Sequence, residues 1–408
     1  MKHLVLIITI CLSAGARAKV MTLEECLTAA YEHNLQLKAE QIAVEKSRLL
    51  IGTAFDIPNT GVELAQDATE GGGMDNGITI SQEFDFPTIY IAKRKALKAD
   101  YSVARGQLEE KKNELCGQVF SAYYTLLFSH RKVGVLECLS ATYADFVNTA
   151  HVRYKEGEAS RLECMNADRM KAKIDMELRQ ASLELNSNAL NLMTLTGTEE
   201  PIEPAESDLQ VLEMTELTDD FIPEQTYSGK TRELELRLSE RKLSVAKQDF
   251  LPGISLSATT QMLINGFNPY NIHRERFEKG NFMGFSVGLT LPLFFGTKRA
   301  NLLAARRDLE IAQMRIEEER VRLNKEYAEA KNEYLAARQA LSYYEQTGLG
   351  QANEIARLAK VSYELGEIDY MEYIQNIETA TAVELEYLES IERYNQSIIK
   401  LKTIKGTI

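Results

Sequence analysis

The side chains that most often carry out chemistry stand far apart in this sequence. The histidines His33, His130, His151 and His273 show no metal-ligand spacing, and no Cys-x-x-Cys pair occurs. Neither a glycine-rich phosphate loop nor the Gly-x-Ser-x-Gly or His-Glu-x-x-His signature is present. The sequence therefore predicts no catalytic residue, no bound metal and no cofactor, and we do not expect an enzyme.

Carboxylates are the one reactive group in excess. The 408 residues include 60 acidic and 47 basic side chains, which gives a formal net charge of −13. Pairs of carboxylates are so frequent in such a chain that they do not indicate glycoside hydrolysis. The negative balance also argues against a nucleic-acid partner, because binding nucleic acid requires a cationic face. What the acids do depends on the elements that position them.

Residues 1–18 have the composition of a secretory signal peptide. Lys2 precedes an apolar run over residues 4–12, and the small residues at 16–18 fit a cleavage site. Cys11 lies inside the apolar run, which argues against lipidation there. No later segment approaches the ~20 apolar residues of a membrane helix, so the chain can enter a membrane only as strands.

Four cysteines remain after the signal peptide, and we expect buried thiols rather than disulfides. If the chain turns at Gly157, helix geometry displaces Cys138 from Cys164 by roughly 18 Å, too far for a bond. Cys26 and Cys116 are expected to behave as small hydrophobic residues.

Two segments carry the periodicity of unusually long helices. Residues 88–156 contain no proline, residues 298–366 repeat the pattern, and each segment holds close to 70 residues. Helices over about 158–196 and 367–405 follow them, which predicts two long antiparallel hairpins.

The turns of both hairpins share the pattern Tyr-x-x-Gly-Glu. The tyrosines are Tyr154 and Tyr363, and the glycines are Gly157 and Gly366. A glycine can close a helix by adopting the left-handed conformation, so one interpretation is a pair of simple helix caps without further function.

Short segments between the helices alternate with period two, as strands do. Strands are expected at about 253–265 and 281–291, and more weakly at about 60–68 and 76–86. In the last strand of the chain one face is wholly apolar: it comprises Met283, Phe285, Val287 and Leu289. Prolines bracket each strand pair, where the chain must change between helix and strand.

The chain therefore reads as two copies of one plan: helix, strand, strand, very long helix, glycine turn, helix. We assign a signal peptide to residues 1–18, a first repeat to 19–198, a linker to 199–230 and a second repeat to 231–408.

Four strands cannot close a barrel alone, and open sheet edges do not occur in lipid. Three copies would supply 12 strands, an even number within the range of outer-membrane barrels. Aromatic residues near the strand ends could form the interfacial girdle: Phe84, Phe86, Tyr90, Phe250, Phe294 and Phe295. The alternative is a soluble pair of β-hairpins packed on a coiled coil.

The duplicated plan, the proline-bracketed hairpins and the two Tyr-x-x-Gly turns resemble the TolC family of outer-membrane efflux proteins. The resemblance covers essentially the whole chain after the signal peptide. It implies an α+β membrane protein: a homotrimer with a shared 12-stranded barrel in outer-membrane lipid and a long α-helical barrel in the periplasm. It also implies docking to a periplasmic adaptor (membrane fusion) protein and an inner-membrane pump.

The same resemblance assigns roles at the periplasmic tip. An acid six residues after each glycine, here Glu163 and Glu372, is expected to narrow the entrance, and Asp369 adds further charge. Tyr363 matches a tyrosine that holds the tip closed. Ile368 stands where a basic partner is common, so Arg153 or Arg161 are candidate substitutes. The alternative for these acids is a set of solvated turn residues.

The second turn resembles the heavy-metal branch, the CusC- and CzcC-like channels that serve RND-type (cation) pumps. Multidrug efflux and type I secretion are alternatives within the family. A periplasmic coiled-coil tether or adaptor is the alternative of another class, but it has no use for an apolar strand face.

Overall fold

The computed structural model describes residues 19–68, 74–214, 220–261 and 283–408. Contacts divide the chain into two compact units. One unit comprises the described parts of residues 1–39, 109–227 and 321–408, and the other comprises those of 40–108 and 228–320. Each unit therefore takes segments from both sequence repeats. The predicted signal peptide, residues 1–18, lies outside the described residues.

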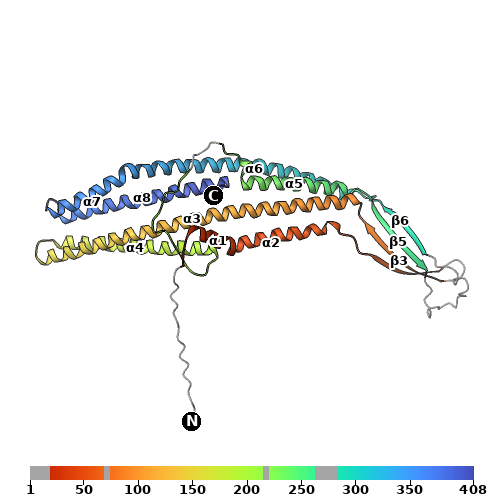
Figure 1. The fold of residues 1–408 in the computed structure, drawn as a ribbon, viewed down its shortest axis with the longest axis horizontal. Helices are drawn as coiled ribbons and strands as arrows, with labels where there is room; N and C mark the ends of the chain where they lie inside the picture. Colours follow the sequence, from red (N-terminus) through yellow and green to blue (C-terminus); the bar gives the residue numbers. More distant parts are fainter. Residues whose placement is uncertain (1–18, 69–73, 215–219, 262–282) are drawn as a thin grey trace, which may run out of the picture. The chain divides into compact units, whose positions relative to one another are not determined.

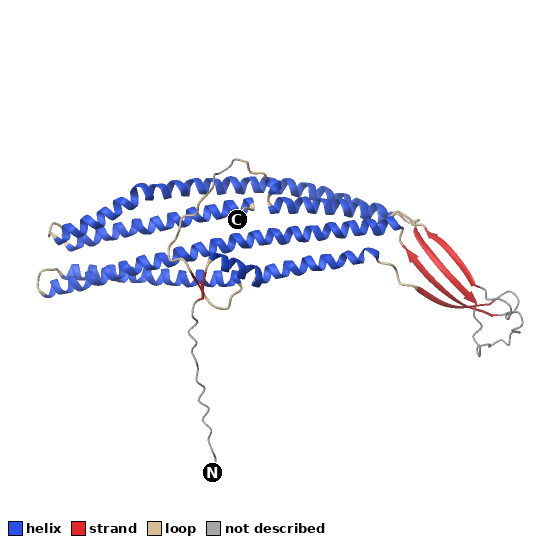
Figure 2. Ribbon diagram, in the orientation of Figure 1, coloured by secondary structure: helices blue, strands red, loops and turns tan. Residues whose placement is uncertain are grey.

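The element order repeats itself along the chain (Figures 1 and 2). The first half contains β1 (Lys19–Met21), α1 (Leu23–His33), α2 (Leu35–Leu50), a 3₁₀ helix (Ile51–Phe55), β2 (Gly61–Ala68), β3 (Met74–Phe84), α3 (Pro87–Lys155), α4 (Arg161–Thr196) and β4 (Ile202–Pro204). The second half contains a 3₁₀ helix (Pro223–Gln225), α5 (Tyr227–Gln248), β5 (Gly253–Gln261), β6 (Met283–Thr290), α6 (Gly296–Tyr343), a π-helix (Tyr344–Gly348), α7 (Leu349–Glu364) and α8 (Tyr370–Lys405).

The strands of both repeats form one antiparallel sheet in the order β2-β3-β5-β6. The central pair is β3 with β5, where Ile80 lies opposite Ala258. The β-hairpin of the first half, β2-β3, therefore pairs with the β-hairpin of the second half, β5-β6, through β3 and β5. Among the described residues, no helix combines the length and the apolar content of a membrane span.

The helical hairpins pack on each other through α3, α4 and α8, and their two turns lie at the same end of this unit (Figure 1). The shared core contains Leu139, Tyr143, Phe146, Ala150, Cys164, Ala167, Ile174 and Ile374. Burial of these side chains holds α3 and α4 together and attaches α8 to both.

The segment between the repeats is fixed to the helices by buried polar contacts. β4 pairs in parallel with β1. Tyr123 on α3 donates its hydroxyl to the Met21 carbonyl at 3.1 Å and also contacts the Glu206 carboxylate. Asn395 on α8, which is fully buried, accepts the Leu212 N–H at 2.8 Å. The described residues of the linker are therefore held in place by partners of their own.

The expected second long helix is not continuous, because a π-helix separates α6 from α7. A π turn contains one residue more than an α turn, so it shifts the phase of the buried stripe. Within it, Tyr344 donates its hydroxyl to Glu386 on α8 at 3.1 Å. Local periodicity does not reveal one inserted residue in a pattern this long.

The helices that return from the turns begin three residues later than expected, at Arg161 and Tyr370. The physical reason is capping: Ser160 and Asp369 have extended backbones, and their side chains accept the N–H of Glu163 and Glu372.

The four cysteines in the described part of the chain are free thiols, and three of them are buried: Cys26, Cys116 and Cys164. The expectation was wrong for Cys138, which is exposed on α3. Cys164 donates its thiol to the Ala150 carbonyl at 3.3 Å, which joins α4 to α3.

Candidate functional site

Both glycine turns have the geometry of helix C-caps. Gly157 has a φ of +78° and Gly366 a φ of +73°. The N–H of Glu158 reaches the Arg153 carbonyl at 2.8 Å, and the N–H of Glu367 reaches the Ser362 carbonyl at 2.8 Å. These bonds satisfy carbonyls that the helix end leaves open. The two turns therefore have one architecture, as their shared sequence predicts.

The acids at the turns are exposed, and their main chains are held by the caps. Ser160 Oγ accepts the Glu163 N–H at 3.2 Å, and Asp369 Oδ1 accepts the Glu372 N–H at 2.8 Å. Asp369 thus acts as a helix cap, a role that its position after the glycine also fits. The carboxylates of Glu163 and Glu372 lie in the first turns of α4 and α8, where the helix dipole favours negative charge.

No basic side chain neutralises this group of acids within the described part of the chain. Arg153 and Arg161 form no ion pair within 4.0 Å there, so the proposed substitutes for the absent base at Ile368 are not engaged. Tyr154 is 45% exposed. The tip of a single chain therefore presents acid without a charged partner.

Aromatic stacking takes the place of a charged contact at Tyr363. Its ring stacks on Tyr373 with centroids 5.1 Å apart and 18° between planes, and it lies 4.9 Å from the ring of Tyr370. Tyr370 in turn contacts Phe146 of α3 at 4.8 Å. Sequence reasoning missed Tyr370 and Tyr373, although their spacing of three residues on one helix face was a usable signal.

One face of the sheet is mostly apolar, with Gln82 and Thr260 among its polar members. Phe285 lies opposite Ala258, which lies opposite Ile80, which lies opposite Val62. Directly opposed residues of an antiparallel pair share a face, so the alternation of the four strands is in phase. The exposed apolar side chains of this face include Val62, Leu64, Ile80, Leu256, Met283, Phe285, Val287 and Leu289. Phe285 is 75% exposed and Val287 76%, so no described residue covers them.

The opposite face of the sheet carries hydroxyls, glycines and the acids Glu63 and Glu83. Thr79 and Thr259 share a hydrogen bond of 3.1 Å between their hydroxyls, and Ser257 and Ser286 share one of 2.7 Å. A sheet with these two faces separates an apolar environment from a polar one.

The expected aromatic girdle is only partly present. Phe294 is 93% exposed, and Phe295 stacks on Phe250 at 6.0 Å. Tyr90 is buried instead, stacked on Phe55 at 5.8 Å, and its hydroxyl accepts the Asp85 N–H at 2.8 Å. Tyr90 is therefore a core residue, which the sequence did not reveal because its partner lies 35 residues away.

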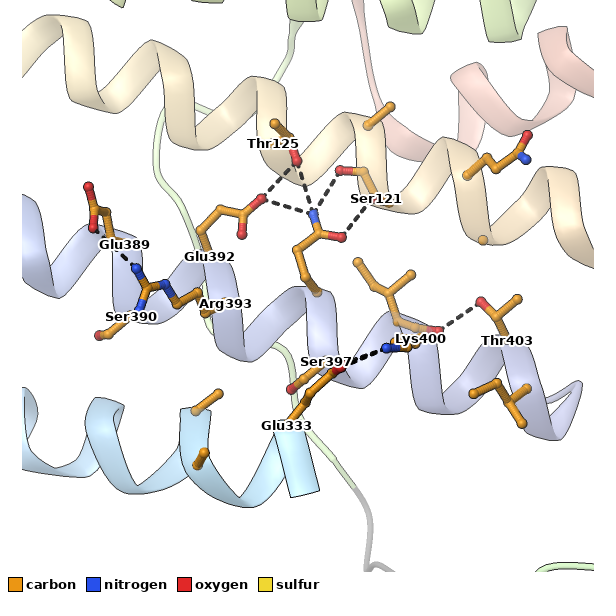
Figure 3. Close-up of a pocket in the computed structure, with 18 of the residues that line it drawn as sticks. Ser121, Thr125, Glu333, Glu389, Ser390, Glu392, Arg393, Ser397, Lys400 and Thr403 are labelled. Carbon is orange, nitrogen blue, oxygen red and sulfur yellow. Dashed lines mark hydrogen bonds and ion pairs between the residues drawn. The ribbon is translucent and has the colours of Figure 1, made fainter. Parts of the chain in front are cut away.

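A groove of about 1470 Å³ lies between α3, α4, α6 and α8 (Figure 3). Its charged lining is mostly acidic, with Arg393 and Lys400 as the basic members. The acids are Glu114, Glu326, Glu333, Glu386, Glu389 and Glu392. Lys400 bridges α8 to α6 through Glu333 at 2.7 Å.

Glu392 belongs to a polar network in that groove (Figure 3). Thr125 donates its hydroxyl to Glu392 Oε1 at 2.8 Å, and Gln396 Nε2 donates to the same oxygen at 3.0 Å. Ser121 donates to Gln396 Oε1 at 2.6 Å. Burial raises the pKa of the Glu392 carboxyl, against the effect of these donors. The sequence shows that Ser121 and Thr125 on α3, and Glu392 and Gln396 on α8, are each four residues apart. It does not show that these two pairs contact each other.

Among the described residues, no group of three or more His, Cys, Asp or Glu side chains is placed to hold a metal ion.

These features define a class of protein: a duplicated helix–strand–strand–helix plan whose strands form one two-faced sheet and whose hairpins end in acidic glycine turns. Residues 230–407 match the family model of outer membrane efflux proteins. The chain is thus similar to the outer membrane efflux protein family over residues 230–407, and it has a TolC-like fold over nearly its whole length.

Particular relatives agree with this class. The chain is 20% identical, over 95% of its length and 90% of the relative's, to the cobalt-zinc-cadmium resistance protein CzcC of Cupriavidus metallidurans. A crystal structure of CusC, described in terms of folding and transmembrane channel formation, superposes with a TM-score of 0.77, with 16% identity and coverage of 97% and 95%. The CmeC outer membrane channel of Campylobacter jejuni has a TM-score of 0.73, with 16% identity and coverage of 94% and 85%.

Proposed function

We propose that the protein is the outer-membrane exit duct of a tripartite efflux system and that three copies form the working channel. The observation that carries the proposal is the four-stranded sheet, whose exposed face is mostly apolar from β2 to β6 while its other face is polar. Three such sheets would form a closed 12-stranded barrel, with Met283, Phe285, Val287 and Leu289 facing lipid. The conduit is passive and needs no catalytic group.

The cargo we propose is a metal cation. CzcC is named for cobalt, zinc and cadmium resistance, and the acids at both turns favour a cationic cargo. In a trimer, Glu163 and Glu372 would place about six carboxylates around one axis, which attracts cations and repels anions. Multidrug efflux and type I secretion would use the same duct with another pump.

The partners follow from the same proposal. The signal peptide over residues 1–18 exports the chain without lipidation at Cys11, an adaptor protein contacts the Gly157 and Gly366 turns, and an RND-type pump supplies the cargo. The tip residues Tyr154, Tyr363 and Asp369 shape the periplasmic entrance.

The test is to extract the protein from outer-membrane fractions in detergent and to measure its mass and its single-channel conductance in planar bilayers. A trimer with a small, cation-selective conductance supports the duct. A monomeric, non-conducting protein in the soluble fraction would favour a periplasmic tether instead.

A further inference from the structure

The strand ends that connect to α2, α3, α5 and α6 all lie at one edge of the sheet (Figure 1). In the register of the sheet, Phe84 at the end of β3 pairs with Ile254 near the start of β5, and Gly253 pairs with Thr290 at the end of β6. The sheet and the helix ends that meet it belong to one compact unit. We call the 15 residues that adjoin each of these strand ends the basic belt: 46–60, 85–99, 238–252 and 291–305.

The basic belt differs in charge from the chain as a whole. It contains 11 Lys and Arg residues against 4 Asp and Glu residues, a formal charge of +7, whereas the whole chain carries −13. Each of the four segments contributes at least two of these cations, so the charge surrounds the sheet edge and is not confined to one helix. A surface with this charge attracts an anionic partner, even on a chain that is acidic overall.

Nine of the 11 cations are exposed. The two half-buried ones are those that the chain itself uses: Lys93 forms an ion pair with Asp85 at 2.9 Å, and Lys298 donates to the Asp249 carbonyl. None of the nine exposed cations forms an ion pair within 4.0 Å with a described residue. Their charge is therefore not neutralised by the described part of the chain.

Large apolar side chains are exposed in the same belt. Phe294 is 93% exposed and Leu293 74%, and Phe55, Ile57 and Leu291 are exposed as well. All five stand between the strand end and the nearest cation of their segment. A chain that leaves the hydrocarbon of a bilayer carries apolar and aromatic residues first, and then Lys and Arg at the headgroups. A soluble acidic partner would explain the cations, but not the exposed apolar residues that separate them from the sheet.

The start of α3 shows both kinds of side chain on one side of a helix. Arg94 and Lys95 lie three and four residues after Ile91, and Lys98 lies a further turn along, so the four residues are neighbours on the helix surface. All four are exposed, while Tyr90 beside them is buried. This side of α3 therefore presents an apolar residue nearer the sheet and three cations beyond it.

We propose that the basic belt binds the anionic phospholipid headgroups of the leaflet that borders the helices. The ligand is a phosphodiester that carries two acyl chains: the apolar residues contact the chains, and the Lys and Arg side chains contact the phosphates. Polybasic segments beside a membrane span are attracted to anionic lipid in this way. The inference rests on the proposed function, because it requires the sheet to lie in a membrane, and it adds which lipid is bound and by which residues.

The cations lie close enough to the sheet for this contact. On α3 they fall within the first three turns, about 17 Å along the helix axis. The headgroup layer of one leaflet accounts for about 5–8 Å of that distance. Long Lys and Arg side chains extend toward the interface, and the Debye length adds about 8 Å at physiological ionic strength.

Lipid retention by the unchanged protein is the first test. The intact detergent-extracted protein is incubated with an equimolar mixture of phosphatidylglycerol and phosphatidylcholine that have the same acyl chains. Free lipid is removed by gel filtration, and the retained lipid is quantified by mass spectrometry. We expect more phosphatidylglycerol than phosphatidylcholine at about 0.1 M salt, and little preference at about 1 M, where the Debye length is about 3 Å. This comparison needs no variant, so it holds even if a variant fails to fold.

Two variants with the same change in net charge then locate the contact. The belt variant combines R94Q, K95Q, K98Q and R299Q. Its preference for phosphatidylglycerol should fall by at least about fivefold, roughly the contribution of one cation at an anionic surface. The control variant combines K155Q, R179Q, R338Q and K360Q. These four residues are exposed in the other compact unit, so the control should keep the preference of the unchanged protein.

The outcomes separate this inference from the proposed duct. Equal retention of the two lipids by a trimer from outer-membrane fractions would overturn the inference and leave the duct standing. An equal loss of preference in the control variant would do the same, because net charge alone would then explain the binding. Displacement of phosphatidylglycerol by an equal concentration of inorganic phosphate would assign the belt to a free anion instead. A monomeric protein that is absent from outer-membrane fractions would overturn both proposals.

Discussion

The phenol ring of Tyr363 stacks on that of Tyr373, with centroids 5.1 Å apart and planes inclined by 18°. The contact ties the last turn of α7 to the first turns of α8 within one chain. Through Tyr370 the same group of rings reaches Phe146 on α3. The second hairpin is thereby attached to the first by aromatic contact. In the proposed duct, a tip held in this way would open by separation of the rings, without any ion pair having to break.

Replacing Tyr363 with Ala should increase single-channel conductance, because the stack that holds the end of α7 is lost. Offset aromatic pairs contribute about 0.5–1.5 kcal/mol beyond their buried area. Y363F is the matched control, since it keeps the ring and removes only the hydroxyl, and its conductance should match that of the unchanged protein. Equal opening in both variants would show that the hydroxyl, and not the stack, holds the tip.

The acids after the glycine turns should set the ion preference of the channel. E163Q with E372Q removes about six charges from a trimer, so the reversal potential in a salt gradient should move toward zero. The effect should shrink at high salt, because the Debye length falls from about 10 Å at 0.1 M to about 3 Å at 1 M. E24Q, on an exposed residue in the first turn of α1, should leave selectivity unchanged. Selectivity that persists in the double variant would mean that the turns are solvated surface only.

Arginine at Val287 should impair assembly in the outer membrane, whereas arginine at the adjacent Ser286 should be tolerated. The two positions lie on opposite faces of β6, and Val287 is opposite Leu256 on the apolar face. Charge on a lipid face costs roughly 2–4 kcal/mol at the middle of the bilayer. The measurement is the amount of heat-resistant trimer in membrane fractions. Equal losses for V287R and S286R would count against a lipid-facing sheet.

The predictable parts of this fold are those that local periodicity determines. The stripe of α3 and the alternation of β6 arise from residues a few positions apart, so the sequence reveals both the element and its exposed face. The contacts that sequence reasoning missed join distant segments: Tyr90 to Phe55, Tyr363 to Tyr373 across the turn, and Thr125 to Glu392. The sequence did not predict the π-helix at Tyr344, because one extra residue barely disturbs a long helical pattern. The site residues that the resemblance assigns lie at the two glycine turns or in the first helical turns after them, but the sequence could not predict the contacts that these residues make.

The pH dependence of stability should report the half-buried carboxyl of Glu392, whose pKa lies above its usual 4.5 because burial disfavours the charged form. Between pH 4.5 and the raised pKa the folded state binds more protons than the unfolded state, so stability falls as the pH rises through this range. Above the raised pKa the full cost of the buried charge is present.

E392Q removes that charge and keeps an oxygen that can accept from Thr125 and Gln396. It should therefore raise the melting temperature at pH 7.5 and have little effect at pH 4. The shift expected at pH 7.5 is on the order of 2 °C, since 1 kcal/mol corresponds to about 2–4 °C for a domain of 150–250 residues. E389Q is the matched control, because Glu389 is three residues away and exposed. It should leave the melting temperature unchanged at both pH 7.5 and pH 4. A lower melting temperature for E392Q at pH 7.5 would show that the ionised network stabilises the helices, and that its hydrogen bonds outweigh the cost of burial.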